Sequence, residues 1–182
     1  MIEAHDPPLR IRYATVSDNI QLAEVGAETF YDSFAAENTP ENMAAYLAEA
    51  FGPEKQAREL ADSASRFLIV ERDGLTVGYA RLKFGEAPPA IMGRRPMEIV
   101  RFYARKAWIG KGVGARLMRA CLREAERAGR DVVWLGVWER NSRAIAFYRK
   151  WGFVQAGTQM FRLGDDPQRD LLMARPVSSR QV

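Results

Sequence analysis

The sequence predicts a single α+β domain, residues 1–182, with a mixed central sheet of about seven strands flanked by helices. A length of 182 residues, 47% of them apolar, favours one domain with one sizeable core. Strand-like and helix-like segments follow one another irregularly, with runs of strands in the middle and at the end of the chain. One strand–helix–strand unit, residues 97–138, lies between these runs. Residues 1–8 and 177–182 are expected to be loose tails.

Three kinds of signal predict the helices and strands in the first half of the chain: alternation of polar and apolar residues, helix-capping residues and turn residues. Residues 10–14 alternate in polarity, and Thr15 to Asp18 resembles a helix capping box with Asp in place of Glu or Gln. Pro40 suits the first turn of a helix, and Asp73-Gly74 is a strong hairpin signal. These signals predict, in order, a strand at 10–14, helices at 18–33, 38–51 and 54–61, and strands at 66–71 and 76–84.

Prolines, glycines and apolar runs predict the helices and strands in the second half of the chain. The prolines of residues 85–96 indicate a loop, and Gly129 and Gly152 are suited to end helices. The run VVWLGVW is rich in β-branched and aromatic residues, which favours a strand. The predicted elements are a strand at 97–104, a helix at 112–128, a strand at 132–138, a helix at 141–151, and strands at 153–163 and 170–174.

The single cysteine and single histidine argue against several kinds of site. Cys121 falls at an apolar helix position typical of the core, and His5 lies in the polar N-terminal segment. These counts disfavour Cys/His or Ser/His catalysis and leave no metal site. No apolar run reaches the ~18 to 20 residues of a membrane helix, and no signal-peptide core is present. We therefore expect a cytoplasmic protein that has no membrane partner.

The charge of the chain is mildly positive. The net charge of +4 fits a small anionic ligand and does not require nucleic acid. No basic run with interleaved aromatic residues is present, so we expect no nucleic-acid partner.

A glycine-rich loop joins the strand at 97–104 to the following helix. It consists of Ile109, Gly110, Lys111, Gly112, Val113 and Gly114. Glycines remove Cβ atoms, so backbone N–H groups can surround an anion, and the helix N-terminus adds a partial positive charge. The pattern predicts a phosphate-binding loop. The alternative is a flexible turn without a ligand.

Two common phosphate-binding motifs fit this loop poorly. The Walker pattern G-x-x-x-x-G-K-[ST] is absent. The dinucleotide pattern G-x-G-x-x-A matches at Gly110, Gly112 and Ala115. That fingerprint also needs an acidic residue at the end of the next strand, whereas Asp131 precedes the strand and Glu139 lies too far along. The surroundings of the loop therefore disfavour a dinucleotide site.

The loop and its neighbours resemble the GNAT family of N-acetyltransferases. The phosphate loop of that family is Q/R-x-x-G-x-G/A, which Gly112 and Gly114 match. Ile109 occupies the Q/R position, a departure that removes one side-chain interaction but leaves the backbone cradle. Residues 98–104 (EIVRFYA) resemble the family's fourth strand, and residues 141–153 resemble its second cofactor motif.

The resemblance covers about residues 9–176 and extends to one branch of the family. Three segments resemble spermidine/spermine acetyltransferase-like proteins: residues 38–43 (NTPENM), 134–141 (WLGVWERN) and 163–166 (LGDD). This likeness implies acetyl-CoA as cosubstrate and a small primary amine as acceptor, with polyamines leading and amino acid, peptide or protein amines as alternatives. The resemblance to the family also favours a homodimer.

The resemblance also implies the residues that bind the cosubstrate. The backbone of Phe102 and Ala104 is expected to pair with the pantetheine arm, as an added strand would. The full implied set is Phe102, Tyr103, Ala104, Ile109, Gly110, Lys111, Gly112, Val113, Gly114, Asn141 and Tyr148.

Acetyl transfer from a thioester to an amine requires a neutral amine, a stabilised oxyanion and a protonated leaving thiolate. Glu98 is the candidate base, acting through water; the alternative is a strand residue charge-paired with Arg101 or Arg81. Tyr148 is the candidate acid: a phenol, with a pKa near 10, is protonated at neutral pH and can supply a proton to the leaving thiolate, whose thiol has a pKa near 8.5. The alternative for Tyr148 is a core position.

Acceptor recognition is expected from the first helix, at Glu28, Tyr31 and Asp32, whose alternative is a solvated helix face. Two alternative functions, from other functional classes of protein, stay open. One is a GNAT-fold regulator that holds CoA without turnover, which Ile109 in the Q/R position would favour. The other is an NAD-binding module, which only nicotinamide binding would favour.

Overall fold

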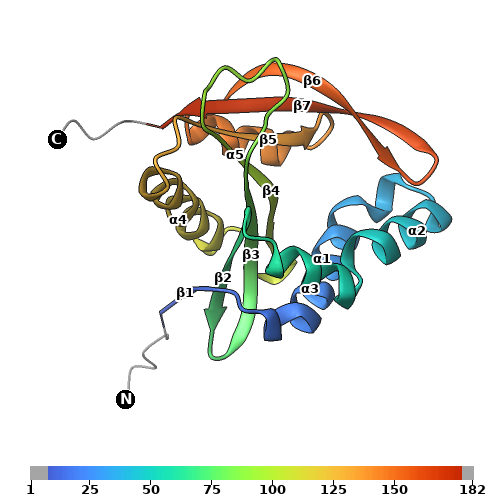
Figure 1. Ribbon diagram of the computed structural model, residues 1–182. Helices are drawn as coiled ribbons and strands as arrows, with labels where there is room; N and C mark the ends of the chain where they lie inside the picture. Colours follow the sequence, from blue (N-terminus) through green and yellow to red (C-terminus); the bar gives the residue numbers. More distant parts are fainter. Residues whose placement is uncertain (1–7, 178–182) are drawn as a thin grey trace.

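The computed structural model describes residues 8–177, which form one seven-stranded mixed sheet with helices on both faces (Figure 1). The strands are β1 (Arg10–Tyr13), β2 (Ser65–Arg72), β3 (Leu75–Phe84), β4 (Pro96–Ala104), β5 (Val132–Trp138), β6 (Val154–Leu163) and β7 (Asp166–Pro176). The helices are α1 (Asn19–Phe34), α2 (Pro40–Phe51), α3 (Pro53–Ala61), α4 (Val113–Arg127) and α5 (Ser142–Lys150). The predicted α+β class is confirmed. His5 lies outside the described residues.

The sheet has the strand order β1-β2-β3-β4-β5-β7-β6, and only β4 and β5 run parallel. Their pairing is short, from Pro96 opposite Val132 to Glu98 opposite Trp134. On its other edge β4 stays paired with β3 as far as Ala104. Within residues 8–177, the remainder of β4 therefore has no strand partner on the β5 side, and the sheet opens there.

Alternate residues of β2 show how the two faces of the sheet are covered. Leu68 and Val70 belong to the core cluster beneath α4, whereas Phe67 and Ile69 pack with Leu22 of α1. Side chains that alternate along a strand point to opposite faces. Helix α4 thus covers one face, and α1 and α3 cover the other (Figure 1). Cys121 of α4 is fully buried in the first cluster, as its predicted core role requires.

Helix α1 begins one residue later than predicted, because a short 3₁₀ turn, Val16–Asp18, precedes it. The predicted capping box is present in this turn. The Thr15 N–H donates to Asp18 Oδ2 at 2.7 Å, and Arg12 forms an ion pair with the same carboxylate at 2.7 Å. The Asp18 side chain thereby links β1 to the turn that precedes α1.

The β6–β7 hairpin is longer than the sequence predicted. Strand β7 begins at Asp166, four residues before the predicted start, because Gly164 with φ +61° and Asp165 make a tight turn. The first residues of β7 are mostly exposed and polar, so they lack the apolar alternation that signals a strand. Among residues 8–177, no helix has the length and apolar content needed to cross a membrane.

Candidate active site

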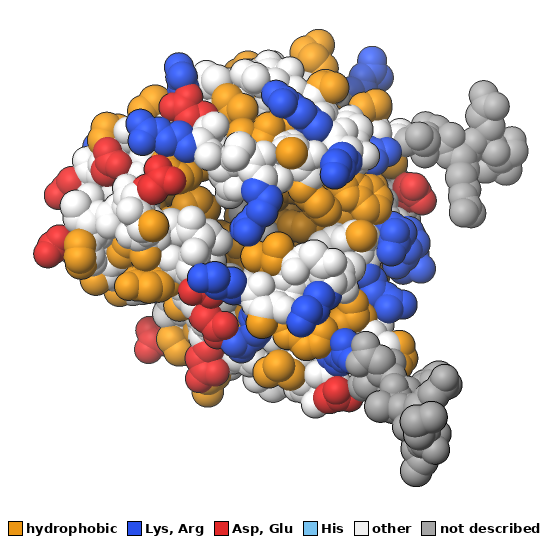
Figure 2. All heavy atoms as spheres, turned by 180° about the vertical axis from the view of Figure 1, so that it is seen from behind, with side chains coloured by type: hydrophobic (Ala, Val, Ile, Leu, Met, Phe, Trp, Pro, Cys, Tyr) orange, Lys and Arg blue, Asp and Glu red, His pale blue; other side chains and the backbone are white. Residues whose placement is uncertain are grey.

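A cavity of about 520 Å³ lies where β4 and β5 part. On the face seen from behind, hydrophobic side chains are recessed between Lys and Arg side chains (Figure 2). The cavity extends from the glycine loop to β7. Its lining includes Phe30, Ser33, Phe34, Tyr46, residues 99–104, Trp108, Ile109, Gly110, Gly112, Gly114, Gly136, Trp138, Asn141, Arg143, Phe147, Tyr148, Phe161, Gln168 and Asp170.

The glycine loop forms one end of this cavity. Gly112 is the N-cap of α4 with φ +82°, and a Cβ built there would meet nothing within 4 Å. The first N–H groups of α4 have no acceptor within the helix, so they are available to an anion. Ile109, Gly110, Gly112 and Gly114, which are among the residues predicted to bind the cosubstrate, line the cavity.

Two residues of the predicted loop lie outside the cavity lining. The Lys111 Nζ atom lies 5.3 Å from the centroid of the Trp108 ring, and the Val113 side chain is fully buried in the core. Only the backbone of Val113 remains to contact a ligand. Trp108 itself lines the cavity.

Strand β4 forms the long wall of the cavity. Residues 99–104 all line it, including the predicted Phe102, Tyr103 and Ala104. The register shifts so that Arg81 pairs with Arg101 and Leu82 pairs with Ile99, which makes Val100 a bulge residue. Beyond Glu98 the β5-facing edge of β4 has no strand partner, so its backbone groups can pair with an extended ligand.

Tyr148 of α5 lies in the cavity wall, held by three aromatic rings. Its ring centroid is 6.1 Å from that of Phe102, 5.6 Å from that of Phe147 and 5.9 Å from that of Phe153. Burial raises the pKa of Tyr148 well above the usual value of a phenol, so the hydroxyl keeps its proton near neutral pH. Asn141 Oδ1 accepts from the Ala144 N–H at 3.1 Å, which confirms Asn141 as the N-cap of α5.

Glu98 lies beside the cavity and is not part of its lining. It is half-buried on β4, opposite Lys83 of β3 and opposite Trp134 in the last parallel pair with β5. Burial raises the pKa of Glu98, and the charges of Lys83 and Arg81 partly oppose that increase. Proton transfer from an amine in the cavity to Glu98 would therefore need an intervening water.

The predicted acceptor residues of α1 face away from this cavity. Glu28 forms an ion pair with Arg105, and Asp32 is exposed. Tyr31 is 55% exposed and lines a separate, smaller pocket of about 210 Å³. The cavity is instead lined by Phe30, Ser33 and Phe34, which share the opposite face of the same helix.

The far end of the cavity is closed by residues that the sequence did not single out for function. Tyr46 comes from α2, and Phe161, Gln168 and Asp170 come from the β6–β7 hairpin. Gln168 Nε2 donates to Asn38 Oδ1 at 2.6 Å, which joins the hairpin to the α1–α2 connection. Burial raises the pKa of Asp170 to about 6. No local motif marks Asp170, because it is one acidic residue in a strand.

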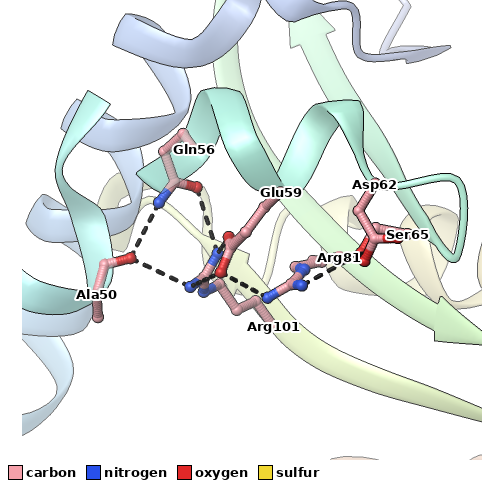
Figure 3. Close-up of polar contacts among 7 residues, drawn as sticks. All are labelled: Ala50, Gln56, Glu59, Asp62, Ser65, Arg81 and Arg101. Atoms are coloured by element: carbon pink, nitrogen blue, oxygen red, sulfur yellow. Dashed lines mark hydrogen bonds and ion pairs between the residues drawn. The ribbon is translucent and has the colours of Figure 1, made fainter. Parts of the chain in front are cut away.

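A buried charge network supports the β4 wall from the side of α3 (Figure 3). Arg101, which lines the cavity, donates to Glu59 at 2.5 Å, to Gln56 at 3.3 Å and to the Ala50 carbonyl at 3.1 Å. Arg81 donates to the same Glu59 carboxylate at 2.7 Å. Two guanidinium groups therefore share one carboxylate.

Comparisons with known proteins agree with this geometry. The sequence model of the acetyltransferase (GNAT) family matches residues 27–153. An uncharacterised N-acetyltransferase encoded in the pepI 3′ region of Lactobacillus delbrueckii subsp. lactis is 32% identical over 169 residues, 93% of this chain and 98% of the relative. A spermidine N(1)-acetyltransferase of Thermoplasma acidophilum is 26% identical over 149 residues, 80% of this chain and 88% of the relative.

The fold is also found in solved structures. The crystal structure of the PaiA N-acetyltransferase of Thermoplasma acidophilum in complex with coenzyme A superposes with a TM-score of 0.75 at 22% identity. The match covers 93% of this chain and 99% of that protein. The likeness confirms the predicted architecture over nearly the whole chain.

Proposed function

The chain belongs to the acetyltransferase (GNAT) family and is an acetyl-CoA-dependent N-acetyltransferase, and we propose that its acceptor is a small aliphatic amine, with polyamines as the leading class. The observation that carries this proposal is a single cavity that runs from the glycine loop, past Tyr148, to an aromatic acceptor end. The relative named spermidine N(1)-acetyltransferase supports the polyamine class. A CoA-binding regulator without turnover is not favoured, because the relatives are named N-acetyltransferases.

The described residues fit acetyl-CoA. The open space at Gly110 and Gly112, with the N-terminus of α4, suits phosphate groups, and the unpaired edge of β4 suits the pantetheine amides. Arg143 at the start of α5 adds positive charge to the same lining. When bound, the cosubstrate supplies an acetyl group activated as a thioester.

Tyr148 is proposed as the general acid. Its ring is fixed by Phe102, Phe147 and Phe153, and its hydroxyl is protonated at neutral pH. A fixed, protonated phenol in the cavity wall can donate a proton to a departing thiolate. The thiol has the lower intrinsic pKa, so the transfer is uphill and depends on the position in which the rings hold the phenol. Asn141 supports this placement by capping the helix that carries Tyr148.

Glu98 is proposed as the general base, acting through water. Its raised pKa makes it a stronger proton acceptor than an exposed glutamate. It lies where β4 and β5 part, at the margin of the cavity. A backbone N–H on the unpaired edge of β4 is proposed to polarise the thioester carbonyl.

The experiment that tests this function measures the release of free CoA thiol from acetyl-CoA in the presence of different amines. The panel contains spermidine, spermine, shorter diamines, amino acids and a peptide with a free N-terminus. We expect acceptor-dependent release, fastest with an aliphatic polyamine. If an amino acid or peptide is acetylated fast and polyamines are not acetylated, the polyamine assignment is overturned. The assignment as an N-acetyltransferase would still stand.

Three expectations from the sequence stay predictions: a single domain over residues 1–182, a cytoplasmic location and a homodimer. Size-exclusion chromatography with light scattering measures the oligomeric state directly. Limited proteolysis tests the domain prediction, because one compact domain should lose only short terminal segments.

A further inference from the structure

We propose that Asp170 binds a second ammonium group of the acceptor, the one that is not acetylated, so that the enzyme selects diamines and longer polyamines over monoamines. This inference rests on the proposed function and assigns its acceptor specificity to one side chain. It follows from the position of Asp170, its lack of a cationic partner and the rings around it.

The carboxylate of Asp170 lies at the acceptor end of the cavity. Asp170 is opposite Trp138 of β5 and Gln159 of β6, and both Trp138 and Asp170 line the cavity. A Cβ built on Gly136, another lining residue, would lie 3.2 Å from Asp170 Oδ2. The missing side chain at Gly136 thus leaves the space into which the Asp170 carboxylate extends.

Among the described residues, no cation neutralises this carboxylate. Within residues 8–177, no Lys or Arg forms an ion pair with Asp170. The adjacent Arg169 pairs with Glu139 at 2.6 Å instead. Burial raises the pKa of Asp170 to about 6, and a hydrogen bond from Gln159 partly opposes the increase. Near neutral pH the cavity therefore contains an ionised, unpaired carboxylate, whose desolvation a bound ammonium group would offset.

Aromatic rings surround the approach to Asp170. The Tyr46 and Phe161 rings lie 5.5 Å apart, and the Phe34 and Trp138 rings lie 5.9 Å apart. All four line the cavity. Burial raises the pKa of Tyr46, the charge of Arg101 opposes the increase, and the charge of Asp170 adds to it. Ring faces attract ammonium groups, and an alkyl stem packs against them. The combination of one carboxylate and several rings fits an aliphatic ammonium ion.

Positive charge also lies behind the β4 wall of the cavity, where it is held by α3. Arg101 and Arg81 share the single carboxylate of Glu59 on the α3 side. The Arg101 guanidinium is also held over the Phe51 ring, 5.1 Å from its centroid. These guanidinium groups are paired with Glu59, so an ammonium group in the cavity is attracted to Asp170 on β7. A diamine with one ammonium group at Asp170 can extend its other amine along the cavity toward Tyr148, which lines the same cavity.

The test compares two acceptors of equal length with the wild type and the Asp170→Asn variant. One acceptor is 1,4-diaminobutane, and the other is 4-aminobutan-1-ol, which has a hydroxyl in place of the second amine. We expect the wild type to prefer the diamine. Asp170→Asn should lower kcat/KM for the diamine by about 10- to 100-fold, the range expected for losing a charge-assisted contact. The same variant should change kcat/KM for the amino alcohol by less than about 3-fold and leave KM for acetyl-CoA unchanged.

The matched control is Asp165→Asn, which removes the same charge from the exposed β6–β7 turn. It should leave both acceptors unaffected. An equal loss for diamine and amino alcohol in Asp170→Asn, or no loss for either, overturns the inference. So does a wild type that acetylates both acceptors equally well, although that result leaves the transferase function intact.

Calorimetric binding of 1,4-diaminobutane without acetyl-CoA separates the inference from the proposed function. Binding to the wild type that is lost in Asp170→Asn supports the inference even where no amine is acetylated. Acetylation without any dependence of diamine binding on Asp170 supports the function and overturns the inference.

Discussion

Glu59 on α3 and Arg101 on β4 form a buried ion pair in which Oε2 and Nη1 lie 2.5 Å apart, behind the wall of the cavity. Glu59 also accepts from Arg81, so one carboxylate balances two guanidinium groups (Figure 3). This relationship links the helical layer to the strand that lines the active site. The stability of the fold and the shape of the site therefore depend on the same side chain.

Glu59→Gln should destabilise the protein strongly. The amide cannot neutralise Arg81 and Arg101, and breaking a buried ion pair from one side costs about 3–5 kcal/mol. Urea unfolding followed by circular dichroism measures this change. The control is Glu139→Gln, which removes the partner of Arg169 in a more exposed ion pair and should cost less than about 1 kcal/mol. Similar losses in the two variants would contradict the proposed importance of the buried network.

Gly112→Ala should weaken CoA binding by about 10-fold and destabilise the fold by about 1–2 kcal/mol. Its φ of +82° disfavours any Cβ, and the added methyl group would enter the space assigned to phosphate. Gly74→Ala is the matched control, because Gly74 has φ +76° with the same open surroundings but lies in the β2–β3 turn. The two variants should lose comparable stability, measured by thermal unfolding, and only Gly112→Ala should lose CoA affinity in calorimetry.

Ile109→Arg should strengthen CoA binding by about 3- to 10-fold at low salt, with a smaller gain at high salt. Ile109 lines the cavity, is 41% exposed and occupies the position where the family motif has Gln or Arg. An arginine there can reach an anion at the glycine loop. Ile20→Arg, which adds the same charge at a 59% exposed position on α1, should leave the dissociation constant unchanged. Equal effects of the two variants would indicate a non-specific charge effect.

Tyr148→Phe should lower kcat by about 100-fold or more, the contribution typical of a positioned general acid. The ring contacts with Phe102, Phe147 and Phe153 survive in the variant, so the dissociation constant of acetyl-CoA should change by less than about 3-fold. Stopped assays of thiol release and calorimetry measure the two quantities. Tyr13→Phe, which removes a hydroxyl bonded to Glu124, controls for the loss of a phenol elsewhere. Unchanged turnover in Tyr148→Phe would exclude the tyrosine as the acid.

The features that the sequence predicted well depend on neighbours in the chain. The glycine loop, the Asn141 cap and the Thr15–Asp18 box are each contained in a few residues, so their chemistry is visible locally. The seven strands were predicted because turn residues mark their ends and apolar alternation marks their course. Only β7 was predicted substantially short, since its polar beginning is stabilised by pairing with β6.

The acceptor end was not predictable in the same way, because it is assembled from α1, α2 and the β6–β7 hairpin. Phe30, Tyr31 and Phe34 were all candidates for the wall of the acceptor cleft. Helix α1 has apolar residues on more than one side, so periodicity alone did not separate Phe30 and Phe34, which line the cavity, from Tyr31, which does not. The charged face with Glu28 and Asp32 suited an amine by composition but points elsewhere. The unusual surroundings of Asp170 arise only when β7 pairs with β5 beside Gly136.

Asp170→Asn should stabilise the fold near neutral pH while it weakens the diamine contact. Burial raises the pKa of Asp170 from 3.8 to about 6, so the folded state binds the proton more tightly than the unfolded state. Wild-type stability should therefore fall as pH rises from about 4 to about 6, and the loss is complete above that range. After allowance for solvent exposure of the carboxylate, the variant should be more stable by about 1–2 kcal/mol at pH 7.5.

At a pH of about 4.5 the advantage of Asp170→Asn should be smaller, because the folded wild type is largely protonated there. Urea unfolding at the two pH values measures the difference, and Asp165→Asn, fully exposed in the adjacent turn, should show none. If Asp170 serves binding and not stability, Asp170→Asn should raise the stability of the fold and lower the selectivity for diamines. A destabilised Asp170→Asn at pH 7.5 would instead mean that the carboxylate stabilises the hairpin.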